Sequence, residues 1–218
     1  MVMEYKTVYE GGEGEITVKK SRFIAAVSPA ATEDEALAFI ESVKKKHWNA
    51  THNCFAYVIG EQNALARMSD DGEPGGTAGK PMLDVLLGEE LCNTVVVVTR
   101  YFGGTLLGTG GLVRAYSQAV KEGLASSVII TKIRGVKLKI HTDYTGLGKI
   151  QYILAQRGIK IMDTVYTDKV ELTALAAETE TDSVCAAVTE GTNGQAVVER
   201  EESCWFAEIN GEPSILEA

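Results

Sequence analysis

The sequence predicts an α+β protein of two domains, and three observations lead to that prediction. Short alternating apolar segments, typical of half-buried strands, are interleaved with segments whose apolar residues recur at helical spacing. The 218 residues, 45% of them apolar, suffice to bury a core without disulfide or metal. Glycine and charge are unevenly spread: 15 of the 22 glycines precede residue 135, and residues 1–134 carry only −2 of the net charge of −9. We therefore expect one domain over residues 1–133 and another over residues 134–218, joined by a short connection near 131–135.

The first domain is expected to begin with strands that pair antiparallel. Its predicted strands cover residues 6–9, 14–19, 21–27, 53–59, 64–68 and 93–99. The last of these is almost continuously apolar, which indicates a central strand buried on both faces. A turn is expected at 60–63, between the fourth and fifth strands.

Three helices are expected in the same domain. Thr32 and Glu35 have the spacing of a capping box, and the helix that they begin ends in the basic run Lys44–His47. Pro81 suits the first position of a second, short helix. The third is expected from Leu112 to about Leu124.

The second domain shows the order β-α-β-β-α-β, which predicts a ferredoxin-like fold. The strands are expected at 135–141, 159–166, 169–177 and 195–202, and the helices at 145–157 and 181–190. Gly158 and Gly191 each follow a predicted helix and suit its C-terminal cap. This fold hosts many functions and identifies none by itself.

Composition narrows the function classes. The net charge of −9 argues against a protein that binds nucleic acid through bulk positive charge. The longest aliphatic run, Val95–Val98, is too short to span a membrane, and the N-terminus lacks a signal-peptide core, so we expect a cytoplasmic protein with no membrane partner. Cys54, Cys92, Cys185 and Cys204 form no CxxC or zinc spacing, which favours four core residues in a reducing compartment.

Two glycine-rich loops, residues 69–81 and 100–111, carry most of the information about function. The second follows the buried strand and leads into a helix, a geometry that presents unpaired backbone N–H groups to an anion. Lys80, Arg100 and Arg114 flank the loops and could contribute charge to a phosphate. The alternative is that both loops are tight structural turns that bind nothing.

Known loop motifs fit poorly. A Walker A loop is rejected, because Pro74 occupies the place of its first glycine and Pro81 that of its hydroxyl residue. Gly108-Thr109-Gly110 begins a dinucleotide fingerprint, but Val113 occupies the place of its third glycine. No Gly-x-Ser-x-Gly nucleophile motif occurs, and we predict no catalytic residues.

Asp70, Asp71 and Glu73 admit two interpretations, a metal or acid/base cluster and an acidic turn that is solvated or paired with Arg67 or Arg100. We favour the acidic turn, because no histidine or fourth ligand lies nearby in sequence. Two basic clusters, Lys19–Arg22 and Lys44–Lys46, have Phe23 and Trp48 alongside. Each is more often a solvated surface, but together they leave local RNA contact open.

The runs SDDGEPGGTAGKP (69–81) and VTRYFGGTLLGTGGLVRAY (98–116) resemble the signature of the IMPACT family, specifically its bacterial YigZ-type members. The resemblance implies an N-terminal domain similar to domain IV of elongation factor G, a two-layer β/α fold shared with a ribosomal protein domain and the GHMP kinases. It implies a C-terminal domain similar to domain V of that factor. Eukaryotic members regulate translation.

The sequence and the resemblance together favour a translation-associated regulatory or binding protein. Its expected partners are RNA or the ribosome, contacted through the glycine loops, and a protein partner in translation control. The alternatives are a scaffold protein and a phosphate- or nucleotide-binding enzyme with magnesium at Asp70 and Asp71; we predict no cofactor or metal site. The predicted binding residues are Asp70, Asp71, Gly72, Glu73, Gly75, Gly76, Thr77, Gly79, Lys80, Arg100, Tyr101, Gly103, Gly104, Gly108, Gly110, Gly111 and Arg114.

Overall fold

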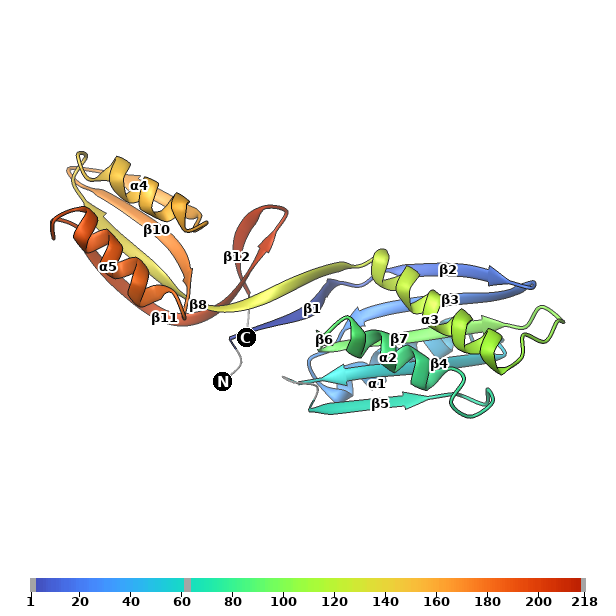
Figure 1. The fold of residues 1–218 in the computed structure, drawn as a ribbon. Helices are drawn as coiled ribbons and strands as arrows, with labels where there is room; N and C mark the ends of the chain where they lie inside the picture. Colours follow the sequence, from blue (N-terminus) through green and yellow to red (C-terminus); the bar gives the residue numbers. More distant parts are fainter. Residues whose placement is uncertain (1–2, 61–63, 217–218) are drawn as a thin grey trace. The chain divides into compact units, whose positions relative to one another are not determined.

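The computed structural model describes residues 3–60 and 64–216, which form two compact units (Figure 1). The N-terminal unit spans Tyr5–Ile130, and the C-terminal unit comprises the described residues from Thr131 onward together with Met3 and Glu4. Both contain helices and strands, as an α+β fold requires.

The N-terminal unit is built on a five-stranded antiparallel sheet in the order β2-β3-β7-β4-β5. The strands are β2 (Glu13–Val18), β3 (Ser21–Pro29), β4 (His52–Ile59), β5 (Leu65–Ser69) and β7 (Thr94–Tyr101). The central strand β7 is buried from Thr94 to Arg100, which confirms the prediction from its apolar run. Of the expected turn at 60–63, only Gly60 lies within the described residues.

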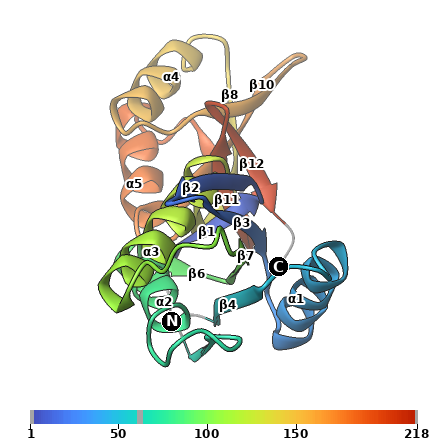
Figure 2. The same cartoon turned by 90° about the vertical axis from the view of Figure 1, so that its right-hand side faces the viewer.

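Helices cover both faces of this sheet (Figure 2). One face carries α1 (Glu33–Lys46), and the other carries α2 (Gly79–Gly88) and α3 (Thr109–Ala125). Val95 and Val97 of β7 pack toward α1, whereas Val96 and Val98 belong to the core beneath α2 and α3. This double coverage is why the strand is apolar on both sides.

The helix starts differ in part from the prediction. Thr32 Oγ1 accepts the N–H of Glu35 at 3.2 Å, as a capping box requires, but Glu35 Oε2 accepts the N–H of Ala31, one residue before the cap, at 2.7 Å. Helix α2 begins at Gly79, so Pro81 is its third residue and not its first. The earlier start follows from Asp70, whose carboxylate binds backbone N–H groups at this end.

The predicted antiparallel start is right for β2 and β3 and wrong for β1 (Glu4–Glu10). β1 pairs in parallel with β6 (Leu91–Cys92), with Lys6 opposite Leu91. A hairpin to β2 does not form, because Gly11 and Gly12 pass close to other backbone. A Cβ at Gly11 would lie 2.0 Å from the Val27 carbonyl oxygen.

The C-terminal unit has the predicted ferredoxin-like fold. Its elements are β8 (Val128–Thr142), α4 (Leu147–Gln156), β9 (Ile161–Tyr166), β10 (Val170–Ala177), α5 (Thr181–Gly191), β11 (Val197–Ile209) and β12 (Glu212–Leu216). The sheet order β9-β10-β8-β11, with every neighbouring pair antiparallel, is that of the split βαβ. Helices α4 and α5 pack one apolar core against it.

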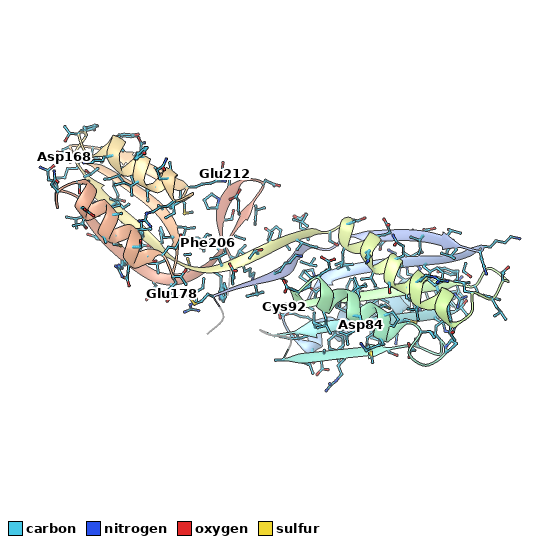
Figure 3. The ribbon with its side chains drawn as sticks, viewed as in Figure 1. Asp84, Cys92, Asp168, Glu178, Phe206 and Glu212 are labelled. Atoms are coloured by element: carbon cyan, nitrogen blue, oxygen red, sulfur yellow. The ribbon has the colours of Figure 1, made fainter. Side chains whose placement is uncertain are left out.

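Glycines in this unit cap a helix or let neighbouring elements approach closely. Gly158 has φ +68° and follows α4, as expected of a C-terminal cap, but Gly191 is the last residue of α5 and does not cap it. A Cβ at Gly191 would lie 2.5 Å from Ile153 Cδ1, so this glycine lets α4 and α5 approach. A Cβ at Gly135 would lie 2.4 Å from the ring of Phe206 on β11 (Figure 3).

The strands around Gly135 are longer than predicted. β8 runs without a break through residues 131–135, where the sequence predicted a connection, and β11 continues to Ile209 to pair with β12. The side chain of Arg134 binds Glu178 at 3.0 Å beside this stretch. Among the helices of residues 3–60 and 64–216, none has the length and apolar character needed to cross a membrane.

Candidate functional site

The two glycine loops line a common cavity of about 430 Å³ in the N-terminal unit, here called the loop cavity. Its wall combines the end of β7, the start of β4, both loops and the first turn of α3. The lining residues are Thr51, His52, Gly72, Glu73, Pro74, Arg100, Phe102, Leu106, Leu107, Gly108, Thr109 and Leu112. The wall is therefore mostly apolar, with a few polar groups, as in many ligand sites.

A buried ion pair joins the two loops at this cavity. Arg100 Nη1 lies 2.6 Å from Glu73 Oε1, and the two side chains are only 6% and 3% exposed. The guanidinium lies 5.3 Å and 5.5 Å from the ring centres of Phe23 and Phe102. Among the described residues its Nε has no hydrogen-bond partner. The acidic turn is thus paired with Arg100, one of the two arginines proposed for it.

Hydrogen bonds extend this pair into the core. Tyr116 on α3 donates its hydroxyl to Glu73 Oε1 at 2.7 Å, and Cys54 Sγ lies 3.3 Å from that hydroxyl. Burial raises the pKa of Cys54 to about 12 and raises the pKa of Tyr116 well above its ordinary value. Both groups therefore stay protonated near neutral pH and serve as fixed polar contacts.

His52 is a site residue that the sequence interpretation did not select. Its Nδ1 donates to the Asp71 carbonyl oxygen at 2.8 Å, which leaves Nε2 directed to Glu73 Oε2 at 3.9 Å. Register places His52 opposite Arg100 across β4 and β7. Only the strand pairing reveals this neighbour, since the two residues are far apart in sequence.

Asp70 and Asp71 bind the protein's own backbone. Asp70 accepts N–H groups from Gly76, Ala78 and Gly79 at 2.8–3.0 Å, and Asp71 accepts that of Asn53 at 2.6 Å. Burial raises the pKa of Asp70, but these backbone donors outweigh it and lower the pKa overall. Within the described ranges, no three acidic, histidine or cysteine side chains are arranged to hold a metal. The magnesium alternative finds no support in this geometry.

The first turn of α3 supplies polar groups to the cavity wall. Gly108 caps the helix with φ +75° and offers no side-chain cap, and Thr109 begins it. The N–H groups of an uncapped first turn carry the positive end of the helix dipole. As predicted, the second glycine loop follows the buried strand β7 and leads directly into a helix.

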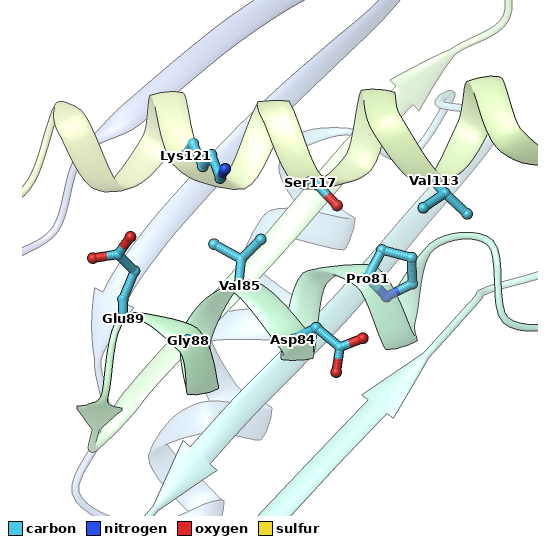
Figure 4. Close-up of a pocket in the computed structure, with 8 residues that line it drawn as sticks. All are labelled: Pro81, Asp84, Val85, Gly88, Glu89, Val113, Ser117 and Lys121. Atoms are coloured by element: carbon cyan, nitrogen blue, oxygen red, sulfur yellow. The ribbon is translucent and has the colours of Figure 1, made fainter.

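Several predicted residues lie elsewhere. Lys80 forms an ion pair with Asp84 on α2, and Arg114 is exposed on α3, with no ion pair among the residues that the structure describes. Neither lines the loop cavity. Asp84, the partner of Lys80, borders a different groove, which lies between α2 and α3 (Figure 4). Tyr101 lies near α1, with its hydroxyl 2.9 Å from His47 Nδ1.

The remaining predicted residues shape the loops. Thr77 is buried and donates to the Pro74 carbonyl oxygen at 2.6 Å. The loop glycines differ in the space that an added Cβ atom would find. Such an atom would meet close neighbours at Gly79, Gly103 and Gly111, and open space at Gly75, Gly76, Gly104, Gly108 and Gly110. Gly72 has φ +87°, and a Cβ there would lie 3.5 Å from His52 Nδ1.

The structure defines an α+β protein of two compact units, in which two glycine loops of the N-terminal unit line one cavity. Its sequence and fold match known proteins. Residues 19–124 match the Impact N-terminal domain, and residues 140–195 match a domain of unknown function, DUF1949. The chain is 46% identical to the IMPACT family member YvyE of Bacillus subtilis over 93% of each chain. It is 41% identical to the IMPACT family member YigZ of Escherichia coli over 68% of this chain and 74% of that one.

A crystal structure described as an hypothetical protein also aligns, with a TM-score of 0.59 and 33% identity over 93% of this chain and 99% of that one. The chain belongs to the IMPACT family, as the two loop sequences predicted.

Proposed function

We propose that this protein is a translation-associated regulatory or binding protein that contacts RNA, free or in the ribosome, through its glycine-loop face. That face comprises residues 69–81 and 100–111. Membership of the IMPACT family supports the link to translation, because the resemblance implies translational control in eukaryotic members. The observation that carries the proposal is the uncapped start of α3 in the wall of the loop cavity, beside the buried Arg100.

This geometry suits an RNA strand for two reasons. The free N–H groups of a helix start bind phosphate without needing a basic side chain, so a chain of net charge −9 can still hold a phosphate locally. Phe102 and Leu106, which are 46% and 82% exposed, border the same cavity and offer apolar surface to a base. Phosphate contact and stacking together are typical of single-strand recognition.

The test places a negative charge where the phosphate is expected. Thr109→Glu should weaken ribosome co-sedimentation and the mobility shift of a labelled RNA at low salt, because its carboxylate competes for the helix start. An acidic residue in the first turn favours the helix, so the fold should persist, which circular dichroism can verify. Thr109→Gln has similar size without the charge and should bind more tightly than Thr109→Glu.

Gln118→Glu is the matched control. It adds the same charge to an exposed position of the same helix, outside the lining of the loop cavity. Because it also replaces the hydrogen bond that Gln118 donates to Glu122 with two like charges, circular dichroism should verify its fold as well. It should leave RNA binding nearly unchanged. If the unmodified protein neither co-sediments with ribosomes nor shifts RNA at low salt, the proposal is wrong; equal losses in Thr109→Glu and Gln118→Glu would refute the location.

A further inference from the structure

The side chain of Trp48 is exposed and is not part of any hydrophobic core cluster of the described residues. Trp48 follows His47, the C-cap of α1, and 82% of its surface is accessible. Single exposed apolar residues are common on soluble proteins, so its exposure alone indicates nothing. What distinguishes Trp48 is that its chain neighbours, His47 and Asn49, contact Tyr101, whose ring in turn contacts a cation.

Contacts among three elements fix these neighbours. The guanidinium of Arg22 on β3 lies 5.7 Å from the ring centre of Tyr101 on β7. The Tyr101 hydroxyl in turn lies 2.9 Å from His47 Nδ1 and 3.4 Å from Asn49 Oδ1. Since Trp48 stands between His47 and Asn49 in the chain, its backbone lies close to the Tyr101 hydroxyl that these two residues contact.

A basic turn connects this region to the second glycine loop. Lys19 and Lys20 form the turn between β2 and β3, both with left-handed φ values of 45° and 68°. A Cβ at Gly103 would lie 2.1 Å from the carbonyl carbon of Lys20, so the loop backbone rests directly on this turn. The Trp48 surface, defined as Lys19, Lys20, Arg22, Lys45, His47 and Trp48, therefore adjoins the glycine-loop face.

Three of the cations of the Trp48 surface are unpaired among the residues that the structure describes. Within residues 3–60 and 64–216, Lys19, Lys20 and Lys45 form no ion pair, whereas Arg22 pairs with Glu15 and Lys46 pairs with Glu13. Together with the exposed Trp48, these three unpaired lysines of the β2–β3 turn and of the last turn of α1 contrast with the acidic chain as a whole. This combination is complementary to a strand that presents both phosphates and unpaired bases.

We propose that the Trp48 surface is a docking site for single-stranded RNA, in which a base stacks on the Trp48 indole and Lys19, Lys20 and Lys45 contact phosphates. The inference rests on the proposed function, which makes RNA the ligand of the adjoining glycine-loop face. Stacking on an aromatic ring tolerates any base, since every base has a π face, and the lysines add a salt-dependent attraction. The expected occupant is thus an unpaired strand and not a duplex.

Trp48 also provides the readout. The chain has two tryptophans, so Trp205→Phe leaves Trp48 as the sole one. In that background, a 12-nucleotide oligoadenylate at low salt should quench Trp48 fluorescence and saturate at the RNA concentration at which the anisotropy of labelled RNA saturates. A 12-base-pair RNA duplex should give no comparable quenching, because its bases are already stacked.

Substitutions then test each part of the surface. Trp48→Ala should weaken oligoadenylate binding about 5- to 100-fold, the range that loss of one stacked base gives, and Trp48→Phe should retain most of the affinity. Lys19→Gln combined with Lys20→Gln and Lys45→Gln should weaken binding and flatten its dependence on salt. Urea unfolding should show that these exposed changes leave the fold intact.

The results separate this inference from the proposed function. Suppose that the RNA binds and that Thr109→Glu weakens its binding, but that the RNA does not quench Trp48 fluorescence and Trp48→Ala binds normally. The docking site at the Trp48 surface is then wrong, and the glycine-loop proposal survives. If polyglutamate of equal charge binds as tightly as the RNA and quenches Trp48 equally, an acidic protein partner replaces RNA at this surface. If no RNA binds at low salt, both proposals fail.

Discussion

Arg100 and Glu73 form an ion pair of 2.6 Å in which both side chains are more than nine-tenths buried, and it links the two glycine loops. Arg100 is buried because its position on β7 is on the same face as Val96 and Val98, beneath α2 and α3. Glu73 comes from the first loop and also accepts the hydroxyl of Tyr116. The relative position of the loops, and with it the shape of the loop cavity, depends on this pair.

Loss of the Glu73 charge should therefore destabilise the protein strongly. Glu73→Gln keeps an oxygen for Tyr116 but leaves the Arg100 guanidinium buried without a counter-charge. Breaking one side of a buried pair typically costs about 3–5 kcal/mol, and the retained acceptor points to the lower end, about 3 kcal/mol of unfolding free energy. Urea denaturation followed by circular dichroism measures this difference.

Arg22 and Glu15 offer a matched control for that experiment. They pair at 2.8 Å with side chains about half exposed. Because water already solvates both charges, Glu15→Gln should shift the urea midpoint far less than Glu73→Gln does. Equal shifts in the two variants would show that the buried pair does not hold the loops together.

The carboxylate of Asp70 should make stability depend on pH. Its folded pKa is lower than the ordinary 3.8, so the unfolded chain takes up a proton more readily than the folded one. The stabilisation by Asp70 is fully present above that ordinary value and is lost as the pH falls through the lowered folded value. Asp70→Asn should thus be less stable than the unmodified protein at pH 7.

The check is urea unfolding of both proteins at pH 7, 5, 4 and 3. The stability difference should stay constant from pH 7 to 5 and then shrink, because protonation removes the negative charge in the unmodified protein as well. A difference that is unchanged at pH 3 would mean that the Asp70 charge does not drive the effect. Comparison of the two proteins cancels the titration of other carboxylates.

The sequence predicts the fold better than the site, for physical reasons. An almost continuous apolar run identified β7 as central, and apolar periodicity indicated the order of the ferredoxin-like elements, because both are local patterns of burial along the chain. It missed β6, since two residues carry no periodicity. Sequence proximity grouped Lys80 and Arg114 with the loops, whereas neither lines the loop cavity, because proximity does not reveal which face of a helix a residue occupies. His52 required the register between β4 and β7, a non-local property.

Cys54 should be unreactive in the folded protein although it lies near the loop cavity. Burial raises the pKa of its thiol to about 12, so almost no thiolate exists at pH 8, and iodoacetamide attacks only the thiolate. Cys185 is partly exposed, contrary to the expectation that all four cysteines are core residues, and provides an internal reference. Peptide mass spectrometry should find Cys185 labelled in the native protein and Cys54 labelled only in urea. Labelling of both at equal rates would contradict the buried Cys54 environment.

Gly103 should be the least replaceable glycine of the two loops. An added Cβ would lie 2.1 Å from the carbonyl carbon of Lys20, which is backbone and cannot rotate away. Gly103→Ala should therefore lower the free energy of unfolding by about 1–3 kcal/mol, or more if the turn between β2 and β3 separates from the loop. Gly75→Ala is the control, because a Cβ there meets nothing within 4 Å. It should change stability by less than about 1 kcal/mol. Equal urea midpoints for Gly103→Ala and Gly75→Ala would show that the loop does not rest on the Lys20 backbone, and would also remove the contact that joins the Trp48 surface to the glycine-loop face.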